Sequence, residues 1–266
     1  NHHKNKLSIN IERDVFKCWV CEYSGRSIYR LIRRYGNYED RKQWGQLTQQ
    51  IDVSTFAEVL LQDDSFVEEE QTLDLPKEFV SLANRELPKT SLYPLNYLES
   101  RGIYKQDIIK WKIGYCDDGD FGSRIIVPSF GLSGKANFFI ARSYGDDWRK
   151  YKNPQASKDI IFNELYLDFD EDLILVEGVF DAIKAGENAV PILGSTLREH
   201  SKLFQEIVKN DTPVYMALDK DAEKKALNLI NKLLKYGIEL YKIDLSPFND
   251  VAEMSRQEFL ERKKNA

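Results

Sequence analysis

The sequence has few cysteines, no long apolar run and no overall excess of positive charge. Only 3 of its 266 residues are cysteine, which is too few for the disulfide framework of a small secreted domain. No apolar run reaches the roughly 18 residues that a membrane-spanning helix needs. The N-terminus shows neither a signal peptide nor an initial Met. These absences predict a cytoplasmic protein with no membrane segment, and the missing Met favours a truncated N-terminus.

Charge is unevenly distributed along the chain. The formal net charge is −5, yet residues 1–36 carry 8 Lys and Arg against 3 Asp and Glu. Residues 37–78 carry 3 basic residues against 11 acidic ones. A chain polarised in this way can bind a polyanion through its basic parts, whereas the acidic block is typical of a solvated linker.

Two apolar runs in the C-terminal part each lead to acidic residues. Residues 173–176 read as a buried strand that ends at Glu177, followed by a glycine turn and a helix. Residues 214–218 read as a second strand, which ends at Asp219 and Asp221. An acidic residue in such a place is commonly a helix N-cap, and Asp219 or Asp221 alone is explained in that way.

The three carboxylates together indicate a metal site. Ligands of an open parallel sheet bind outside the carboxyl ends of its strands, so Glu177, Asp219 and Asp221 are expected to converge. Uncompensated carboxylates would repel one another unless a cation joined them. Oxygen ligands without His or Cys favour Mg²⁺ or Mn²⁺ over zinc.

The complete acidic pattern resembles the TOPRIM domain shared by bacterial-type primases, topoisomerases and some nucleases. Glu177, Gly178 and Asp181 follow the first strand, and Asp219 and Asp221 follow the second. The surrounding sequence predicts the alternation of a parallel sheet. Its strands are expected near 173–177, 189–193, 213–218 and 238–245, and its helices near 179–186, 199–210, 222–236 and 251–263. The loop 194–196 is either a phosphate-binding turn or a plain turn.

The N-terminal residues contain half of a possible zinc site. Two short strands are expected at 7–11 and 15–20, with Cys18 and Cys21 at the end of the second. A structural zinc ion needs four ligands. Residues 16–25 resemble the second half of the zinc-binding domain of bacterial and phage primases, in which a first ligand pair comes earlier in the chain.

Two interpretations of the missing ligand pair remain. Either truncation of the N-terminus removed the pair, which is the interpretation that we favour, or His2 or His3 replaces one member of the pair. Both histidines are otherwise simply polar residues at a chain end. Four arginines that follow are either a solvated helix face or a template-binding surface: Arg26, Arg30, Arg33 and Arg34.

Residues 37–74 are predicted to be an acidic linker. Residues 53–61 fit one amphipathic helix, but the acidic stretches around them have no apolar face to pack. The expected role of this mobile stretch is to tether the zinc module to the catalytic part.

The middle of the chain resembles the opening of the primase catalytic core. Residues 94–102 predict a helix and a glycine stop, and residues 108–114 predict a second short helix. Strands at 124–128 and 136–142 and a basic loop at 149–154 are expected next. Arg124 and Arg142, at strand ends, are candidates for phosphate contacts or for surface salt bridges.

The resemblance implies that Arg142, Lys150 and Asn153 line the groove that holds template and triphosphates. One departure concerns Asn163 and Glu164, which stand where the family commonly has a basic residue. The nucleotide contact carried by that position is therefore open.

Residues 247–253 resemble the third acidic motif of primases. This match places Asp250, and less firmly Glu253, beside the metal site, whereas Ala252 replaces an acidic residue of the family. The sequence continues for about a dozen residues, without the helical and helicase-binding domains that bacterial primases add. We expect either a compact phage-like core or a fragment.

The predicted fold class is α/β: a mixed α+β N-terminal core subdomain (75–170) followed by a TOPRIM parallel-sheet subdomain (171–266), with a partial zinc ribbon (1–36) and the linker 37–74. The resemblance implies synthesis of RNA primers from ribonucleoside triphosphates on single-stranded DNA. It also implies Mg²⁺ or Mn²⁺ at Glu177, Asp219, Asp221 and Asp250, zinc at Cys18 and Cys21 if the ligand set is complete, and a replicative helicase as partner. The alternatives are a TOPRIM nuclease, against which residues 94–154 count, and an inactive template-binding module.

Overall fold

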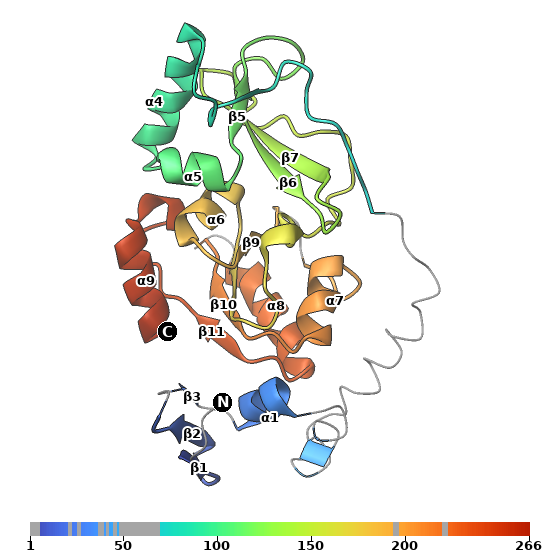
Figure 1. Cartoon of the computed structure of the whole chain (residues 1–266), viewed down its shortest axis with the longest axis vertical. Coiled ribbons are helices and arrows are strands. Elements are labelled where there is room, and N and C mark those ends of the chain that lie inside the picture. The colour runs from blue at the N-terminus through green and yellow to red at the C-terminus, as the bar shows by residue number, and fades with distance from the viewer. Residues whose placement is uncertain are drawn as a thin grey trace. The chain divides into compact units, whose positions relative to one another are not determined.

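The computed structural model describes residues 6–20, 23–25, 28–36, 40, 43–44, 47, 70–193, 197–219 and 223–266. Two compact units divide the chain, residues 1–65 and residues 66–266 (Figure 1). The helix predicted over 53–61, the turn 194–196 and most of the predicted linker lie outside the described residues.

The first unit contains a small antiparallel sheet and a helix. Its elements are β1 (Leu7–Asn10), β2 (Val15–Cys18), β3 (Ser24–Gly25) and α1 (Tyr29–Tyr35), and the strands lie in the order β1-β2-β3. The predicted hairpin is confirmed, because β1 and β2 pair antiparallel with Ile9 opposite Phe16. Asp14 in its turn accepts a hydrogen bond from the Ile28 N–H at 2.8 Å. This bond fastens the hairpin to the start of α1.

The second unit begins with an antiparallel sheet and two helices. The sheet has the order β4-β5-β6-β7, with β4 (Val80–Ser81), β5 (Gly114–Cys116), β6 (Arg124–Phe130) and β7 (Ala136–Ser143). A 3₁₀ turn, η1 (Lys89–Ser91), leads into α4 (Leu92–Ser100), which α5 (Lys105–Lys110) follows. Cys116, Ile126, Phe139 and Ala141 form a buried apolar cluster in this half.

Helix α5 lies earlier in the chain than the sequence predicted. Asp107 accepts a hydrogen bond from the Tyr104 N–H at 3.1 Å and so caps a helix that begins at Lys105. The helix ends before Lys112, whose φ is +53°. Gly114, expected at the helix end, belongs instead to β5.

A parallel sheet with the order β11-β10-β8-β9 forms the rest of the second unit. Its strands are β8 (Leu173–Val176), β9 (Ala189–Pro191), β10 (Val214–Ala217) and β11 (Leu240–Lys242), and all three pairings are parallel. The helices are α6 (Val179–Ala185), α7 (Lys202–Lys209), α8 (Glu223–Lys235) and α9 (Arg256–Asn265). The predicted α/β alternation is confirmed, with shorter elements.

The last helix is shorter than predicted because two side chains divide its sequence. Asp250 accepts a hydrogen bond from the Glu253 N–H at 2.9 Å, which closes a separate 3₁₀ turn, η4 (Val251–Glu253). Ser255 then caps α9 by accepting from the Glu258 N–H at 3.2 Å.

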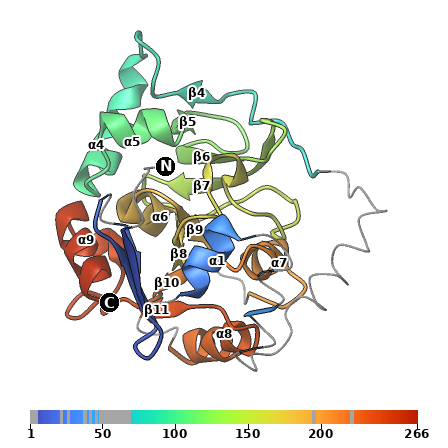
Figure 2. The ribbon, with the colours of Figure 1, turned by 60° about the horizontal axis from the view of Figure 1, so that its bottom comes forward.

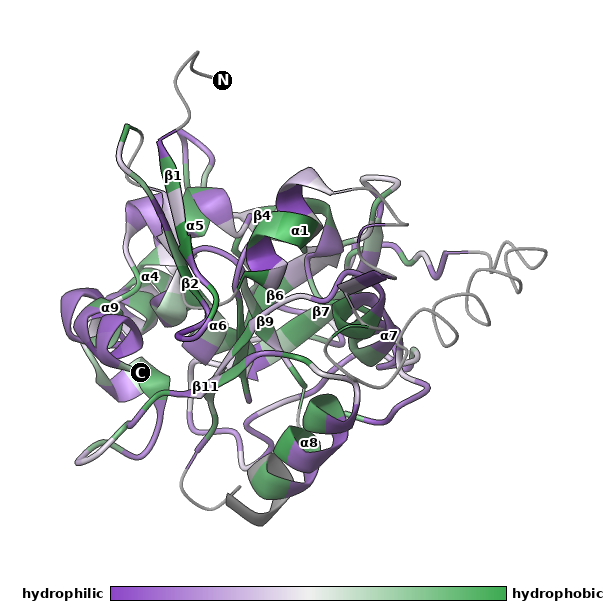
Figure 3. Cartoon of the chain, turned by 90° about the horizontal axis from the view of Figure 1, so that it is seen from below, coloured by the Kyte–Doolittle hydropathy of each residue, from purple (hydrophilic) through white to green (hydrophobic). Residues whose placement is uncertain are grey.

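Burial of apolar side chains holds the parallel sheet and its helices together. All four residues of β8 are buried. Helix α8 places Leu229 and Leu233 in the interior and Leu227 and Leu234 in solvent. Figure 3 shows hydrophobic and hydrophilic residues alternating along this helix. Each buried leucine stabilises the fold by roughly 1.5–3 kcal/mol. Within the described part of the chain, no helix combines the length and apolar character needed to cross a membrane.

Helix α6 lies on the side of the parallel sheet that faces the antiparallel sheet (Figure 1; Figure 2). It packs on β8, β9, η4 and α9. The turn that opens α6 therefore lies where the two halves of the second unit meet.

Candidate active site at the carboxyl edge of the parallel sheet

Glu177 and Asp219 lie at the carboxyl ends of neighbouring parallel strands. Val176, the last residue of β8, is paired with Ala217, the last residue of β10. Glu177 follows the first strand end directly and Asp219 follows the second after one residue, and both side chains are half-buried. The predicted third member, Asp221, lies outside the described residues.

One carboxylate oxygen at this edge has no hydrogen-bond donor. Among the described residues, Oε1 of Glu177 is buried and accepts no hydrogen bond. A buried carboxylate oxygen without a donor is costly, and such an atom calls for a proton, an ion or water. The oxygen therefore fits the role of a ligand to a hard divalent cation.

Asp181 joins this edge to the segment after β11. Its Oδ2 accepts a hydrogen bond from the Gly178 N–H at 3.1 Å, and its Oδ1 accepts from the Ala252 N–H at 3.0 Å. Burial, together with the charges of Asp250 and Glu177, raises the pKa of Asp181 to about 6, although the two backbone hydrogen bonds oppose this rise. The structure thus brings Glu177, Asp181 and Asp250 into electrostatic contact.

The two acidic residues of the 247–253 segment have local hydrogen bonds. Asp250 is half-buried and caps η4 through Oδ1. Glu253 is exposed, and its Oε2 accepts from the Asn249 N–H at 2.9 Å. Glu253 therefore closes its own turn, whereas the charge of Asp250 acts on Asp181.

Arg142 lies close to the start of α6. Its guanidinium carbon is 5.6 Å from the ring centre of Phe180, which belongs to the first turn of that helix. Its Nε donates to the Tyr97 hydroxyl at 2.7 Å, and its Nη1 donates to the Tyr151 hydroxyl at 2.6 Å. Arg101 donates to the same Tyr97 hydroxyl at 3.0 Å. A cationic cluster thus lies beside the acidic edge.

Sequence reasoning assigned no role to Tyr97 or Arg101. Both belong to the string Tyr97-Leu-Glu-Ser-Arg101-Gly102, which carried part of the resemblance. Their i, i+4 spacing at the C-terminal end of α4 allows Arg101 to reach the Tyr97 hydroxyl. This spacing is the sequence signal from which their contact could have been predicted.

Arg124 is not brought together with Arg142. Arg142 pairs with Ile125 across the β6–β7 ladder, so the neighbouring Arg124 points to the opposite face. Arg124 is only 6% exposed, forms an ion pair with Asp147 and donates to the Gly122 carbonyl at 2.9 Å. The salt-bridge interpretation of Arg124 fits this setting, and a phosphate contact does not.

The other predicted groove residues differ in their exposure. Lys150 is exposed. Asn153 is half-buried and accepts from the Ala141 N–H at 3.3 Å through Oδ1, which fixes the loop to β7. Of Lys150 and Asn153, Lys150 is the one that is available to contact a phosphate without rearrangement.

Hydrogen bonds to β6 hold Asn163 in place. It adopts a left-handed conformation with φ of +58°. Its N–H donates to the Ser129 hydroxyl at 2.9 Å, and its Oδ1 accepts from the Phe130 N–H at 3.1 Å. Burial raises the pKa of the neighbouring Glu164, and the charges of Glu206 and Glu70 raise it further. Asn163 therefore supports the end of β6.

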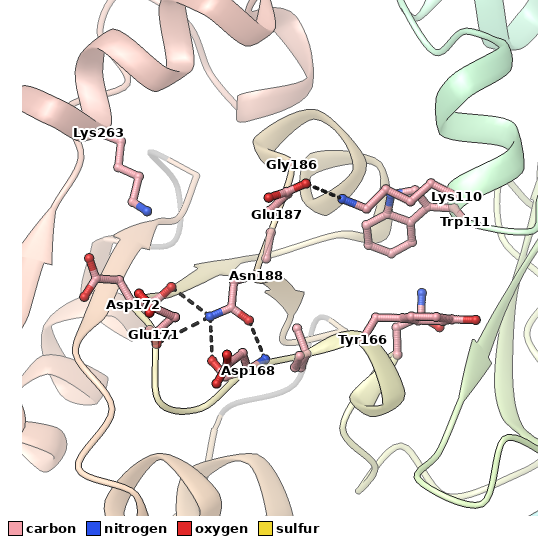
Figure 4. A pocket seen from close by; sticks show the side chains of 13 residues that line it. Lys110, Trp111, Tyr166, Asp168, Glu171, Asp172, Gly186, Glu187, Asn188 and Lys263 are labelled. Carbon is pink, nitrogen blue, oxygen red and sulfur yellow. Dashed lines mark hydrogen bonds and ion pairs between the residues drawn. The ribbon is translucent and has the colours of Figure 1, made fainter. Parts of the chain in front are cut away.

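A separate pocket of about 650 Å³ lies at the opposite end of the strands (Figure 4). Asp172 and Ala189, which flank the amino ends of β8 and β9, line it. Asn188 donates to the Asp168 and Asp172 carbonyls at 2.7 and 2.9 Å and so holds its floor. The pocket is thus distinct from the acidic edge.

Only half of the predicted zinc site is described. Cys18 is buried at the end of β2, whereas Cys21, His2 and His3 lie outside the described residues. Within the described ranges no three His, Cys, Asp or Glu side chains are grouped as metal ligands.

Comparisons with known proteins point to one class of enzyme. No protein-family profile matches the sequence. A DNA primase of Thermotoga maritima is 24% identical over 254 residues, which cover 87% of this chain and 43% of that protein. The chain therefore spans less than half the length of this curated relative.

Solved structures of primases share the fold. A DnaG primase catalytic domain bound to single-stranded DNA superposes with a TM-score of 0.58 and 20% identity, covering 67% of this chain and 73% of that one. The zinc-binding and RNA polymerase domains of the Aquifex aeolicus primase give a TM-score of 0.56 at 20% identity, covering 98% of this chain and 75% of that one. The chain therefore has the fold of the catalytic core of bacterial DnaG primases, and it resembles a bacterial DNA primase in sequence over most of its length.

Proposed function

We propose that this chain synthesises short RNA primers on single-stranded DNA by template-directed nucleotidyl transfer. The main support is the position of Glu177 and Asp219 at the carboxyl ends of two paired strands, next to Asp181, on which the charge of Asp250 acts, and near the cationic Arg142. Nucleotidyl transfer needs both halves of this arrangement, because carboxylates hold cations and cations contact phosphates. The likeness to primases in fold and sequence supports the same reaction over phosphodiester hydrolysis.

The donor set fits Mg²⁺ or Mn²⁺, held by Glu177, Asp219, Asp221 and Asp250. The donor-free Oε1 of Glu177 supports this assignment. When bound, the cations would neutralise triphosphate charge and lower the pKa of the attacking 3′-hydroxyl. Glu177 serves as a ligand or as a general base, and Asp181 positions the Glu177 turn through Gly178.

On the cationic side, we assign phosphate contacts to Arg142 and Lys150. Tyr97 and Tyr151 engage Nε and Nη1 of Arg142, and Nη2 forms no hydrogen bond to any described residue. The two tyrosines hold the guanidinium in one orientation, so less side-chain entropy is lost when it binds an anion. Asn153 shapes this loop and offers its amide nitrogen to substrate.

The finer organisation of the chain is part of the proposal. Residues 1–36 form a zinc-binding module, residues 37–74 a linker, and residues 75–170 and 171–266 the two catalytic subdomains. Cys18 and Cys21 hold zinc when the first ligand pair is present. The buried position of Cys18 and the matching zinc-binding domain of the Aquifex aeolicus primase support this assignment. The expected setting is the cytoplasm, with a replicative helicase as partner.

The decisive assay supplies single-stranded DNA, four labelled ribonucleoside triphosphates and Mg²⁺. We expect short RNA in the wild type and none in Glu177→Gln. Exposed Glu86 lies far from the cluster in sequence, so Glu86→Gln serves as a matched control and should retain synthesis. If the DNA is cut and no RNA is made, the nuclease alternative replaces primer synthesis as the proposed function.

A further inference from the structure

The loop after β7 displays an exposed tryptophan. Trp148 is 83% exposed, although the backbone around it is firmly held. At the base of the loop, the Ser143 N–H donates to the Lys150 carbonyl at 3.0 Å. Arg142 and Tyr151 form an antiparallel bridge beside that bond.

The tip of the loop is held by Arg124. Its guanidinium forms an ion pair with Asp147 and donates to the Arg149 carbonyl at 3.4 Å. Asp147 also accepts from the Arg149 N–H at 2.8 Å. These contacts hold the backbone on both sides of Trp148. A loop whose backbone is already held loses less conformational freedom when a ligand covers it.

Charged groups beside the ring favour a polyanion. The Arg149 guanidinium lies 5.2 Å from the ring centre of Trp148, and Lys150 follows. Neither forms an ion pair with a described residue, whereas the charge of Asp147 is compensated by Arg124. Asp146 is exposed and opposes this charge in part. An aromatic ring interleaved with cations is typical of surfaces that bind single-stranded nucleic acid.

We propose that Trp148 is a stacking platform for one base of the single-stranded template. The same loop carries Tyr151, whose hydroxyl accepts a hydrogen bond from Arg142, so the proposed base contact and the proposed phosphate contact belong to one loop. The ring accepts any base, since stacking uses the π-face that all bases share. This inference rests on the proposed function, because its ligand is the proposed template.

Fluorescence and binding assays on the full chain test whether Trp148 stacks on a template base. Binding of a 12-nucleotide oligothymidylate should quench tryptophan emission in the wild type and not in Trp148→Phe. Trp148→Ala should weaken binding about 5- to 100-fold, and Trp148→Phe should retain most of the affinity. Leu132→Ala removes an exposed side chain at the other end of the β6–β7 hairpin and should bind normally.

An oligomer of abasic sugar phosphate separates stacking from charge. Wild type and Trp148→Ala should bind it equally, and Asp146→Asn should strengthen binding of both oligomers. The stacking role is overturned if Trp148→Ala loses the same affinity for both oligomers. It is also overturned if Trp148→Ala loses no affinity while the wild type makes primers; in both cases the proposed function stands. A wild type that neither binds the oligothymidylate nor makes RNA overturns the proposed function and this inference together.

Discussion

Asp181 accepts a hydrogen bond from the Ala252 N–H at 3.0 Å, although 71 residues separate the two in sequence. This bond connects the turn after β8 with the turn after β11. Asp250 and Glu177 therefore lie near one another because Asp181 spans the distance between their segments.

The pH dependence of stability should report on Asp181. Its pKa of about 6 exceeds the roughly 3.9 of an unfolded aspartate. Between these values the folded chain binds the additional proton, so this contribution is full below about pH 4 and is lost as the pH rises through 6. Urea unfolding with EDTA should show the stability difference between wild type and Asp181→Asn changing by up to about 3 kcal/mol across this window. A constant difference would exclude the elevated pKa.

Removing a carboxylate from the edge should abolish catalysis without unfolding the chain. Asp219→Asn and Asp221→Asn should make no primer, and their Tm should stay within a few degrees of the wild type or rise, because like-charge repulsion falls. Primer synthesis and calorimetry measure the two effects. Near-normal turnover in either variant would remove that residue from the proposed metal site.

The salt dependence of DNA binding should distinguish phosphate contacts from diffuse charge. Lys150→Ala should lower the slope of log K against log salt by about one unit, with little change in base preference. Arg142→Ala should do the same and in addition release Tyr97 and Tyr151. Lys264, exposed on α9, provides the control, and an equal effect from Lys264→Ala would mean that the DNA responds only to total charge.

Arg124 should behave as a structural residue. In a double-mutant cycle, Arg124→Gln and Asp147→Asn should each lower the Tm, and the double variant should lose less than both losses combined. Neither Arg124→Gln nor Asp147→Asn should change the salt slope of binding by a full phosphate contact. A slope reduced in Arg124→Gln alone would restore the phosphate role.

Cys116 should resist alkylation in the folded chain. Burial, together with the charges of Glu78 and Asp118, raises the pKa of its thiol to about 12. At pH 8 the reactive thiolate is therefore scarce. Peptide mass mapping should find Cys116 unmodified by iodoacetamide in buffer and modified in urea. Rapid modification in buffer would mean that the β5 region opens.

The sequence identified the acidic edge because its local signals agree. Residues 173–176 are apolar, Gly178 breaks the strand, and the acidic residue lies between them. The sequence did not predict the face of the sheet to which Arg124 points, because β6 is apolar on both faces and shows no alternation of apolar and polar residues. Its register with Arg142 depends on the hairpin turn at 131–135. The start of α5 was missed because the cap comes from Asp107, inside the helix itself.

The central position of β8 in the parallel sheet determines how firmly Glu177 is held. Hydrogen bonds flank this strand on both sides, and helix α6 packs on it and on its neighbour β9. Amides of Leu175 and Val176 are expected to exchange with solvent deuterium only when the whole unit unfolds, whereas amides of the exposed turn 132–135 exchange through local opening. Glu177 is attached directly to the slowest-exchanging strand. Its position is therefore expected to be as long-lived as the folded unit.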